Sequence, residues 1–384
     1  MKILVVGAGL GGLVAALALR APGHDVEVHE QAPALGEVGA GLTLSRGAQH
    51  VFRTLGIQER VAALACRSSA FPFLHYCTGR LLAGGYDHAD GAPDDGVADV
   101  GRQVHRADLH AVLVAAFAER GSPATLNHRL IGIDDGPGTV TAHFADGSTA
   151  SGDALIGADG VRSVVRELLR GAEQPHYTGQ VAYRFLVPIG VARPFMGAGR
   201  GAVFLGPRRT FNRYTLRGGT IVNCVGIAAV DSWAEEGWAT PVAIAEVREV
   251  FAGWHPDVLG LIDAATDRIK WGIFDRAPLP SWTRGRVTLL GDAAHAMLPF
   301  LGMGAAMAIE DGMILARAFA AEDGVEAAFA RYEAARLPRT TLVHAKSVEQ
   351  GELTQARDPD RYDGQNAPSS DPSITAFDPV TAPI

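Results

Sequence analysis

The sequence contains little cysteine and no excess of positive charge. Only three of its 384 residues are cysteines, namely Cys66, Cys77 and Cys224, and their odd number and spacing fit neither a disulfide framework nor a metal site. We expect reduced thiols, a cytoplasmic location and no bound metal. The net charge of −8 argues against nucleic acid or an anionic membrane as a partner.

Long uninterrupted apolar segments are also missing, so no transmembrane helix is expected. Residues 3–19 carry no charge and follow Met1-Lys2, as in a short signal sequence, but the glycines from Gly7 to Gly12 break the aliphatic run that such a segment needs. This stretch is instead expected to form a strand, a turn and a helix. A hydrophobic content of 47% in 384 residues allows two or three domains with sizeable cores.

The N-terminal stretch matches a dinucleotide-binding fingerprint. Gly7 is placed to make the turn after a predicted strand. Gly9 leaves room for a pyrophosphate, and Gly12 lets the following helix pack closely on the strand. Glu30 ends the next predicted strand, where a carboxylate accepts hydrogen bonds from a ribose. An NAD-linked dehydrogenase would begin in the same way, so this fingerprint alone does not identify the dinucleotide.

A loop around residue 300 carries a second signature, because it joins a buried-strand pattern to an apolar helix. The loop contains Asp292, His295 and Pro299, followed by the glycines Gly302 and Gly304. Glycines let the backbone approach a flat ligand, and a helix start offers free N–H groups and a positive dipole end to an anion. The pattern therefore predicts a site for a charged, planar cofactor.

A third signature runs from Asp153 to Arg166, where an apolar strand ends at Asp159-Gly160 and a helix begins. Asp159 is either a helix N-cap or a group near a cofactor pyrophosphate, and both roles can hold together. Two further segments accompany these signatures. One is the glycine loop Gly36–Gly41, and the other is a helix start that carries Arg106 and Asp108, which also fits a surface ion pair.

The three signatures, which follow one another along the chain at about positions 7, 159 and 292, resemble those of the FAD-dependent aromatic hydroxylases, a family of single-component flavoprotein monooxygenases that includes salicylate hydroxylase and 6-hydroxynicotinate 3-monooxygenase. The resemblance implies an α/β (α+β two-domain) fold, with a Rossmann-type FAD-binding domain and an inserted mixed β-sheet substrate domain like that of p-hydroxybenzoate hydroxylase. It implies non-covalent FAD, O2 and NAD(P)H, with a flavin C4a-hydroperoxide that hydroxylates a small aromatic or heteroaromatic phenol or acid. Because no second Gly-x-Gly-x-x-Gly follows a strand, NAD(P)H is expected to bind transiently over the flavin.

The resemblance also assigns residues to the cofactor. Asp292 would bind the ribityl chain, Pro299 would lie beside the reacting edge of the flavin, and the helix start at Gly302 to Ala305 would face its pyrimidine ring. The full expected FAD set is Gly7, Gly9, Leu10, Gly11, Gly12, Glu30, Gln31, Gly39, Ala40, Gly41, Arg106, Leu130, Asp159, Asp292, Pro299, Gly302, Gly304 and Ala305.

Between residues 171 and 270 the composition shifts to β-branched and aromatic residues, which predicts strands in meander order and a helix near 241–254. This region would form a sheet over the flavin. The tail after Gln355 lacks periodicity and is expected to wrap the surface or to be disordered. The expected division is an FAD-binding domain at 1–72, 100–172 and 276–345, a substrate domain at 73–99 and 173–275, and a tail at 346–384.

For the substrate, the resemblance points to Tyr214, with packing in a half-buried strand as the alternative. Strand alternation places Asn212, Tyr214 and Leu216 on one face and Arg213 on the other. The catalytic residues are expected to be Tyr214 and Pro299, and the substrate contacts Tyr183, Tyr214, Met297, Phe300, Met303 and Arg46, with Arg46 either clamping a carboxylate or solvated.

The chain departs from salicylate-type members at two positions. Thr210 stands where they usually have a histidine and Met303 where they have a glutamine, so the substrate and its activating base are left open. A monooxygenase of bacterial natural-product biosynthesis with a larger substrate, or a flavin-binding redox sensor without turnover, are alternatives. The sequence does not distinguish a monomer from a homodimer, or NADH from NADPH.

Overall fold

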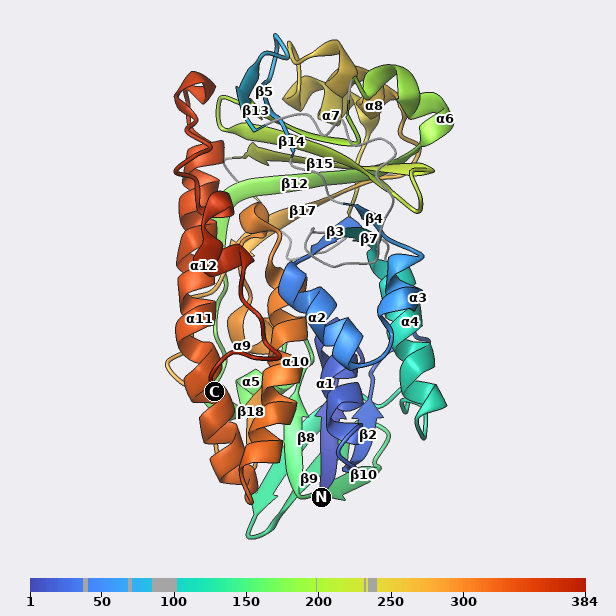
Figure 1. Cartoon of the computed structure of the whole chain (residues 1–384), viewed down its shortest axis with the longest axis vertical. Coiled ribbons are helices and arrows are strands. Elements are labelled where there is room, and N and C mark those ends of the chain that lie inside the picture. Colours follow the sequence, from blue (N-terminus) through green and yellow to red (C-terminus); the bar gives the residue numbers. More distant parts are fainter. Residues whose placement is uncertain (37–40, 68–70, 85–101, 198, 231–232, 234–239) are drawn as a thin grey trace.

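The chain folds around two β-sheets, a small parallel sheet and a large mixed one (Figure 1). The computed structural model describes residues 1–36, 41–67, 71–84, 102–197, 199–230, 233 and 240–384. In the view of Figure 1 the large sheet lies at the top, and long helices run from it down to the parallel sheet. This arrangement confirms the predicted fold class, while the domain boundaries stay predictions.

The parallel sheet has the order β18-β11-β1-β2. Its strands are β1 (Lys2–Val6), β2 (Asp25–His29), β11 (Ala154–Gly157) and β18 (Val287–Leu289). They consist largely of buried aliphatic residues because both faces of a parallel sheet are covered. Since all pairings are parallel, the carboxyl ends of the four strands share one edge.

Helices α1 (Leu10–Arg20) and α10 (Gly304–Ala321) pack side by side through glycines. A Cβ atom on Gly11 would lie 3.0 Å from the Cβ of Ala308, and one on Gly312 would lie 2.7 Å from the backbone nitrogen of Ala15. Because the later residue of α1 meets the later residue of α10, the two helices run parallel. Their N-termini therefore lie at the same end of the pair.

The large sheet has eight strands in the order β16-β17-β12-β15-β14-β13-β5-β6. Its strands are β5 (Phe73–His75), β6 (Leu81–Ala83), β12 (His176–Pro188), β13 (Gly201–Gly206), β14 (Arg209–Leu216), β15 (Ile221–Ala229), β16 (Thr240–Pro241) and β17 (Arg268–Asp275). The predicted meander holds for β13, β14 and β15. It is wrong for β12, which crosses over to lie between β15 and β17.

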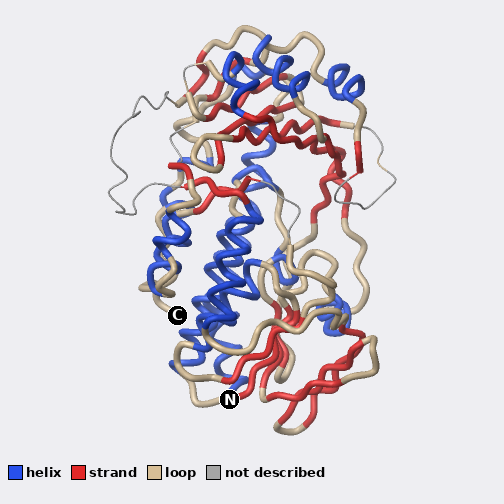
Figure 2. The backbone as a smooth tube through the Cα atoms, turned by 90° about the vertical axis from the view of Figure 1, so that its right-hand side faces the viewer, coloured by secondary structure: helices blue, strands red, loops and turns tan. Residues whose placement is uncertain are grey.

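The two faces of this large sheet have different neighbours. Helices α6 (Ile189–Ala192), α7 (Ile244–Val250) and α8 (Pro256–Ala264) cover the outer face (Figure 2), where they enclose an apolar core with Phe211 and Phe251. The inner face meets the loop around residue 300, because Ala182 and Ile227 pack with Leu298. The inner face is thus the one turned towards the predicted cofactor loop.

Smaller elements complete the fold. Strands β8, β9 and β10 form one three-stranded sheet, and a second such sheet of β3, β7 and β4 lies near the large sheet. The remaining elements are β3 (Gly41–Leu44), β4 (Cys66–Arg67), β7 (Arg102–His105), β8 (Leu130–Gly136), β9 (Thr139–Phe144), β10 (Thr149–Gly152), α2 (Arg46–Thr54), α3 (Gln58–Ala62), α4 (Arg106–Glu119), α5 (Val164–Arg170), α9 (Asp292–His295), η1 (Arg193–Phe195) and η2 (Pro299–Leu301).

The C-terminal part consists of the 30-residue helix α11 (Val325–Thr354) and a tail that packs on the molecule. The tail contains η3 (Pro359–Arg361), η4 (Pro368–Ser370) and α12 (Pro372–Thr375). Tyr362, Ala367 and Ile374 are buried, and Figure 1 shows the tail beside α10 and α11. Of the two predicted states of the tail, the structure shows the one that wraps the surface.

All three cysteines lie in the described part of the chain and none forms a disulfide. Cys66 and Cys224 are buried, whereas Cys77 is exposed in the turn between β5 and β6. Burial raises the pKa of the Cys224 thiol well above its usual range. Within the described ranges, no helix has both the length and the apolar content to cross a membrane.

Candidate functional site

The three cofactor signatures meet at the carboxyl edge of the parallel sheet. Gly7 follows β1 with a φ of +108°, and a Cβ atom there would lie 2.3 Å from the carbonyl oxygen of Ala158, so only glycine fits. The backbone nitrogen of Leu290 donates a hydrogen bond of 2.9 Å to the carbonyl of Gly157. Segments more than 100 residues apart are thereby joined at one edge, where ligands bind in open α/β sheets.

Glu30 directly follows β2, and its carboxylate turns towards the first glycine loop. Its two oxygens accept hydrogen bonds of 2.9 Å from the backbone nitrogens of Ala8 and Ala32. These bonds hold the carboxylate beside the start of α1, as the expected ribose contact requires. Gln31 is exposed next to it.

Asp159 supports the start of α5, whose N-cap is Ser163 and not Asp159. Its carboxylate accepts hydrogen bonds from the hydroxyl of Ser163 and, at 3.1 Å, from the backbone nitrogen of Val165, and burial raises its pKa. The guanidinium of Arg166, which is buried on α5, donates to the carbonyl of Ala293 at 3.2 Å. The second and third signatures are therefore fixed to one another.

The loop around residue 300 exposes polar groups and contains two glycines in the left-handed region. Gly291 and Gly302 have φ values of +64° and +65°, and Asp292, Pro299 and Gly302 are exposed. Neither α10 nor α1 has a side chain that caps its N-terminus. Two uncapped, parallel helix starts fit a cofactor with a pyrophosphate and an electron-rich ring, so the residues present suit FAD.

Tyr214 lies on the inner face of the large sheet, against the second glycine loop. A Cβ atom on Gly41 would lie 2.5 Å from the Tyr214 hydroxyl, and the nitrogen of Gly41 donates to the side-chain oxygen of Asn223 at 3.2 Å. Tyr214 is buried, which raises its pKa to about 12. Gly39 and Ala40, expected FAD contacts, lie outside the described residues.

The structure adds a group that the sequence analysis missed, the guanidinium of Arg184. Arg184 on β12 and Asn212 on β14 both flank Val225 of β15, which puts them on the same face as Tyr214. Arg184 is half-buried, its Nε atom has no hydrogen-bond partner, and no described carboxylate forms an ion pair with it. Burial lowers its pKa to about 10, and Trp271 contributes a cation–π contact at 5.2 Å.

We call Arg184, Asn212, Tyr214 and Asn223 the polar inner face. Besides Arg184, the side-chain oxygen of Asn212 and the side-chain nitrogen of Asn223 are buried without a hydrogen-bond partner. Buried polar atoms normally have partners, so these orphaned atoms indicate a place for a polar ligand. An arginine inside an otherwise apolar strand was the available signal in the sequence.

Two expected substrate contacts lie elsewhere. Tyr183 lies on the outer face, because consecutive residues of a strand point to opposite faces and Arg184 points to the inner one. The Tyr183 hydroxyl lies 3.4 Å from Glu246, and its ring contacts the ring of Phe251. The expectation that Tyr183 faces the substrate is thus corrected. Met303 is buried with Met307, Val343 and Ile374, so it packs towards α11 and the tail.

The other expected residues lie as follows. Phe300 packs with the inner face, and Met297 belongs with Met303. Arg46 and Arg106 are exposed at the starts of α2 and α4, and Asp108 is bonded to Arg217 at 2.7 and 2.8 Å. Leu10, Leu130 and Ala305 belong to the apolar core beside the glycine loops or pack against it.

Comparisons with known proteins agree with this architecture. The family model of the FAD binding domain matches residues 1–193 and 238–347. The chain is 37% identical to 6-hydroxynicotinate 3-monooxygenase of Pseudomonas fluorescens, over 98% of each protein. It is 35% identical to 3-hydroxybenzoate 6-hydroxylase of Polaromonas naphthalenivorans, over 94% of this chain and 90% of that one.

A solved structure gives the same result. Klebsiella pneumoniae HpxO, complexed with FAD and uric acid, superposes with a TM-score of 0.82 at 26% identity, over 94% of this chain and 90% of that one. The matches span nearly the whole chain and include both sheets. The protein therefore belongs to the FAD-dependent aromatic hydroxylases, flavoprotein monooxygenases that use FAD with NAD(P)H as co-substrate.

Proposed function

We propose that this monooxygenase hydroxylates a small aromatic or heteroaromatic ring that carries an anionic oxygen, either a carboxylate or a phenolate. The observation that supports this most is Arg184, a half-buried guanidinium without a described carboxylate partner, on the same face as the Tyr214 hydroxyl. A buried cation is costly to leave unpaired, so a substrate anion is the natural partner. Two relatives are named for substrates of this kind, because one is a 6-hydroxynicotinate 3-monooxygenase and the other a 3-hydroxybenzoate 6-hydroxylase.

The residues of this chain would bind FAD, orient the substrate and exclude water from the flavin. The glycine loops, Glu30 and Asp292 would hold FAD, which supplies the hydride acceptance and oxygen activation when bound. Leu298 and Phe300 pack with Ile227 on the inner face and form an apolar wall that would limit water near the flavin. Tyr214 keeps its proton at neutral pH, because its pKa is about 12, and so donates a hydrogen bond to the substrate anion.

A panel of paired compounds tests the proposal. Hydroxybenzoates, hydroxynicotinates and aminohydroxybenzoates are compared with their methyl esters, which lack the carboxylate, and with their O-methyl ethers, which lack the phenolate, for stimulation of NADH and NADPH oxidation, and product mass is recorded. We expect the parent compounds to stimulate oxidation and to gain one oxygen, and the derivative that lacks the paired anion to respond far less. Equal turnover of neutral or larger ring systems would favour the natural-product alternative, and a lack of stimulation by any compound would favour a redox sensor.

A second expected result concerns Asp292. Asp292→Ala is expected to weaken FAD binding by roughly 1–3 kcal/mol, because it removes an exposed carboxylate at the start of the loop around residue 300 that would bond the ribityl chain. FAD affinity is measured by quenching of flavin fluorescence on titration with apoprotein. Asp323→Ala, an exposed aspartate outside the signatures, is the control. Parental affinity in Asp292→Ala would remove Asp292 from the cofactor site.

A further inference from the structure

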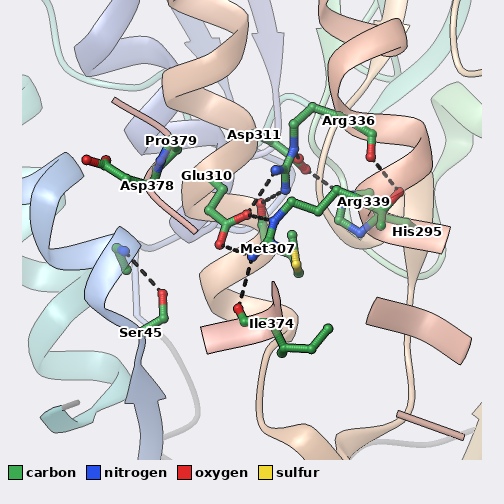
Figure 3. Close-up of polar contacts among 12 residues, drawn as sticks. Ser45, His295, Met307, Glu310, Asp311, Arg336, Arg339, Ile374, Asp378 and Pro379 are labelled. Atoms are coloured by element: carbon green, nitrogen blue, oxygen red, sulfur yellow. Dashed lines mark hydrogen bonds and ion pairs between the residues drawn. The ribbon is translucent and has the colours of Figure 1, made fainter. Parts of the chain in front are cut away.

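A buried ion cluster contacts the loop that carries Asp292 on its protein side. We define this cluster as His295, Glu310, Asp311, Arg336 and Arg339 (Figure 3). These side chains come from α9, α10 and α11, and none of them faces the polar inner face. Each is at most 8% exposed. Such a group of charges is rare inside a protein unless every charge has a partner.

Asp311 is the member that contacts the loop directly. One carboxylate oxygen accepts from the backbone nitrogen of Gly291 at 2.9 Å and from Nε2 of His295 at 2.6 Å. The other accepts from Nε of Arg336 at 2.6 Å. Burial alone would raise the pKa of Asp311, but His295 and Arg336 outweigh it and hold the pKa at about 2. The two bonds to Gly291 and His295 fix the residues on either side of Asp292.

Glu310 extends the cluster to the C-terminal tail. Its carboxylate accepts from Arg336 at 2.9 Å and from Arg339 at 2.8 and 3.0 Å. Arg339 also donates to the carbonyls of Ser373 and Ile374 at 3.0 and 3.3 Å. The ring of Phe377 lies 3.9 Å from the guanidinium carbon of Arg339. A continuous chain of charge-assisted contacts thus joins the tail to the loop.

These contacts depend on one another. Removing one partner from a buried ion pair leaves an uncompensated charge, which the remaining groups must move to satisfy. Tail residues that hold Arg339 therefore influence where Glu310, Arg336 and Asp311 sit. Because Asp311 bonds to Gly291 and His295, a shift in the cluster is transmitted to the backbone that presents Asp292.

We propose that Asp311 is a positioning residue for the flavin loop, and that the tail segment Ser373–Phe377 belongs functionally to the cofactor site because it holds Asp311 in place through Arg339, Glu310 and Arg336. The tail also meets the loop directly, because Ile374 packs with Met303 and Met307. Phe377, which contacts Arg339, is therefore the tail position that tests the route through the buried charges.

The test measures FAD binding by apoprotein without any substrate, so its outcome does not depend on which aromatic compound is hydroxylated. Asp311→Asn is expected to raise the Kd for FAD roughly 10- to 100-fold, the equivalent of a lost hydrogen bond to a charged group. Phe377→Ala is a milder change at a half-buried tail residue, and is expected to raise the Kd roughly 3- to 10-fold. Both variants should alter the visible circular dichroism of bound flavin at saturating FAD.

A conservative pair and a matched control separate positioning from general destabilisation. His295→Gln keeps a side-chain N–H donor for Asp311 and should bind FAD more tightly than His295→Leu. Glu246→Gln breaks the ion pair with Lys270 on the outer face and should change neither the Kd nor the flavin signal. If Phe377→Ala has parental affinity and flavin dichroism, or if His295→Gln and His295→Leu behave alike, the proposal is overturned, even where Asp311→Asn fails to fold.

Discussion

Replacement of Arg184 by methionine is expected to lower kcat/KM for an anionic aromatic substrate roughly 100- to 1000-fold, the equivalent of about 3–4 kcal/mol of transition-state binding. Methionine keeps much of the apolar stem and removes the charge that would pair with the substrate anion. The loss exceeds that of an exposed ion pair because Arg184 is half-buried, where water does not replace the missing partner. FAD content should stay parental.

The measurement is product formation against substrate concentration in parent, Arg184→Met and Arg184→Lys. Lysine keeps a charge but not the two-pronged geometry, so its activity should fall between the two. Arg209→Met on the outer face, where Arg209 bonds to the carbonyl of Val250, is the matched control and should be close to parental. An Arg184→Met enzyme with parental kcat/KM would refute substrate pairing.

The charge of Arg184 is expected to be present over the whole neutral range. Burial lowers its pKa to about 10, and a paired substrate anion would favour the charged form. The pH profile of kcat/KM for an acid whose own charge is constant should therefore show no loss from Arg184 in the neutral range.

Tyr214→Phe is expected to reduce hydroxylation roughly 10- to 100-fold, since it removes one hydrogen bond to a charged group and keeps the ring. Because the pKa of Tyr214 is about 12, the hydroxyl is a donor throughout the neutral range and does not act as the base. Product formed per NAD(P)H consumed should fall as well, because a loosely held substrate lets reducing equivalents be lost without hydroxylation.

Tyr183→Phe provides the control for Tyr214→Phe. It removes a hydroxyl from the same sheet, but from the outer face beside Glu246, and should leave both rate and coupling unchanged. Should Tyr214→Phe keep the parental product rate, or should both variants lose activity equally, Tyr214 would return to a packing role.

The sequence predicted the cofactor edge well, because each of its parts has a local pattern. A strand that runs into a glycine turn or a helix start is recognisable over ten residues, and parallel pairing then brings Gly7, Asp159 and Asp292 to one edge. The role of Gly11 in helix packing could not be predicted from a local pattern. It lets α1 approach Ala308 of α10, a contact between segments nearly 300 residues apart.

The substrate side was harder to predict because it depends on register between distant strands. Alternation within β14 placed Tyr214 and Asn212 on one face, but only the pairing of β12 with β15 shows that Arg184 joins them and that Tyr183 does not. The bond between Asn223 and Gly41 spans 182 positions. The buried ion cluster combines residues of three helices and contacts the tail through Arg339, an arrangement for which no local pattern exists.

The exposed thiol of Cys77 gives the molecule a built-in attachment point. Cys66 and Cys224 are buried, and the Cys224 thiol is held protonated, so a maleimide dye at neutral pH should react at Cys77 without prior mutagenesis. The turn that carries it belongs to the large sheet, whereas the flavin signatures lie on the parallel sheet. Energy transfer between such a dye and flavin would therefore report, in one labelled molecule, any movement of the substrate sheet relative to the cofactor during turnover.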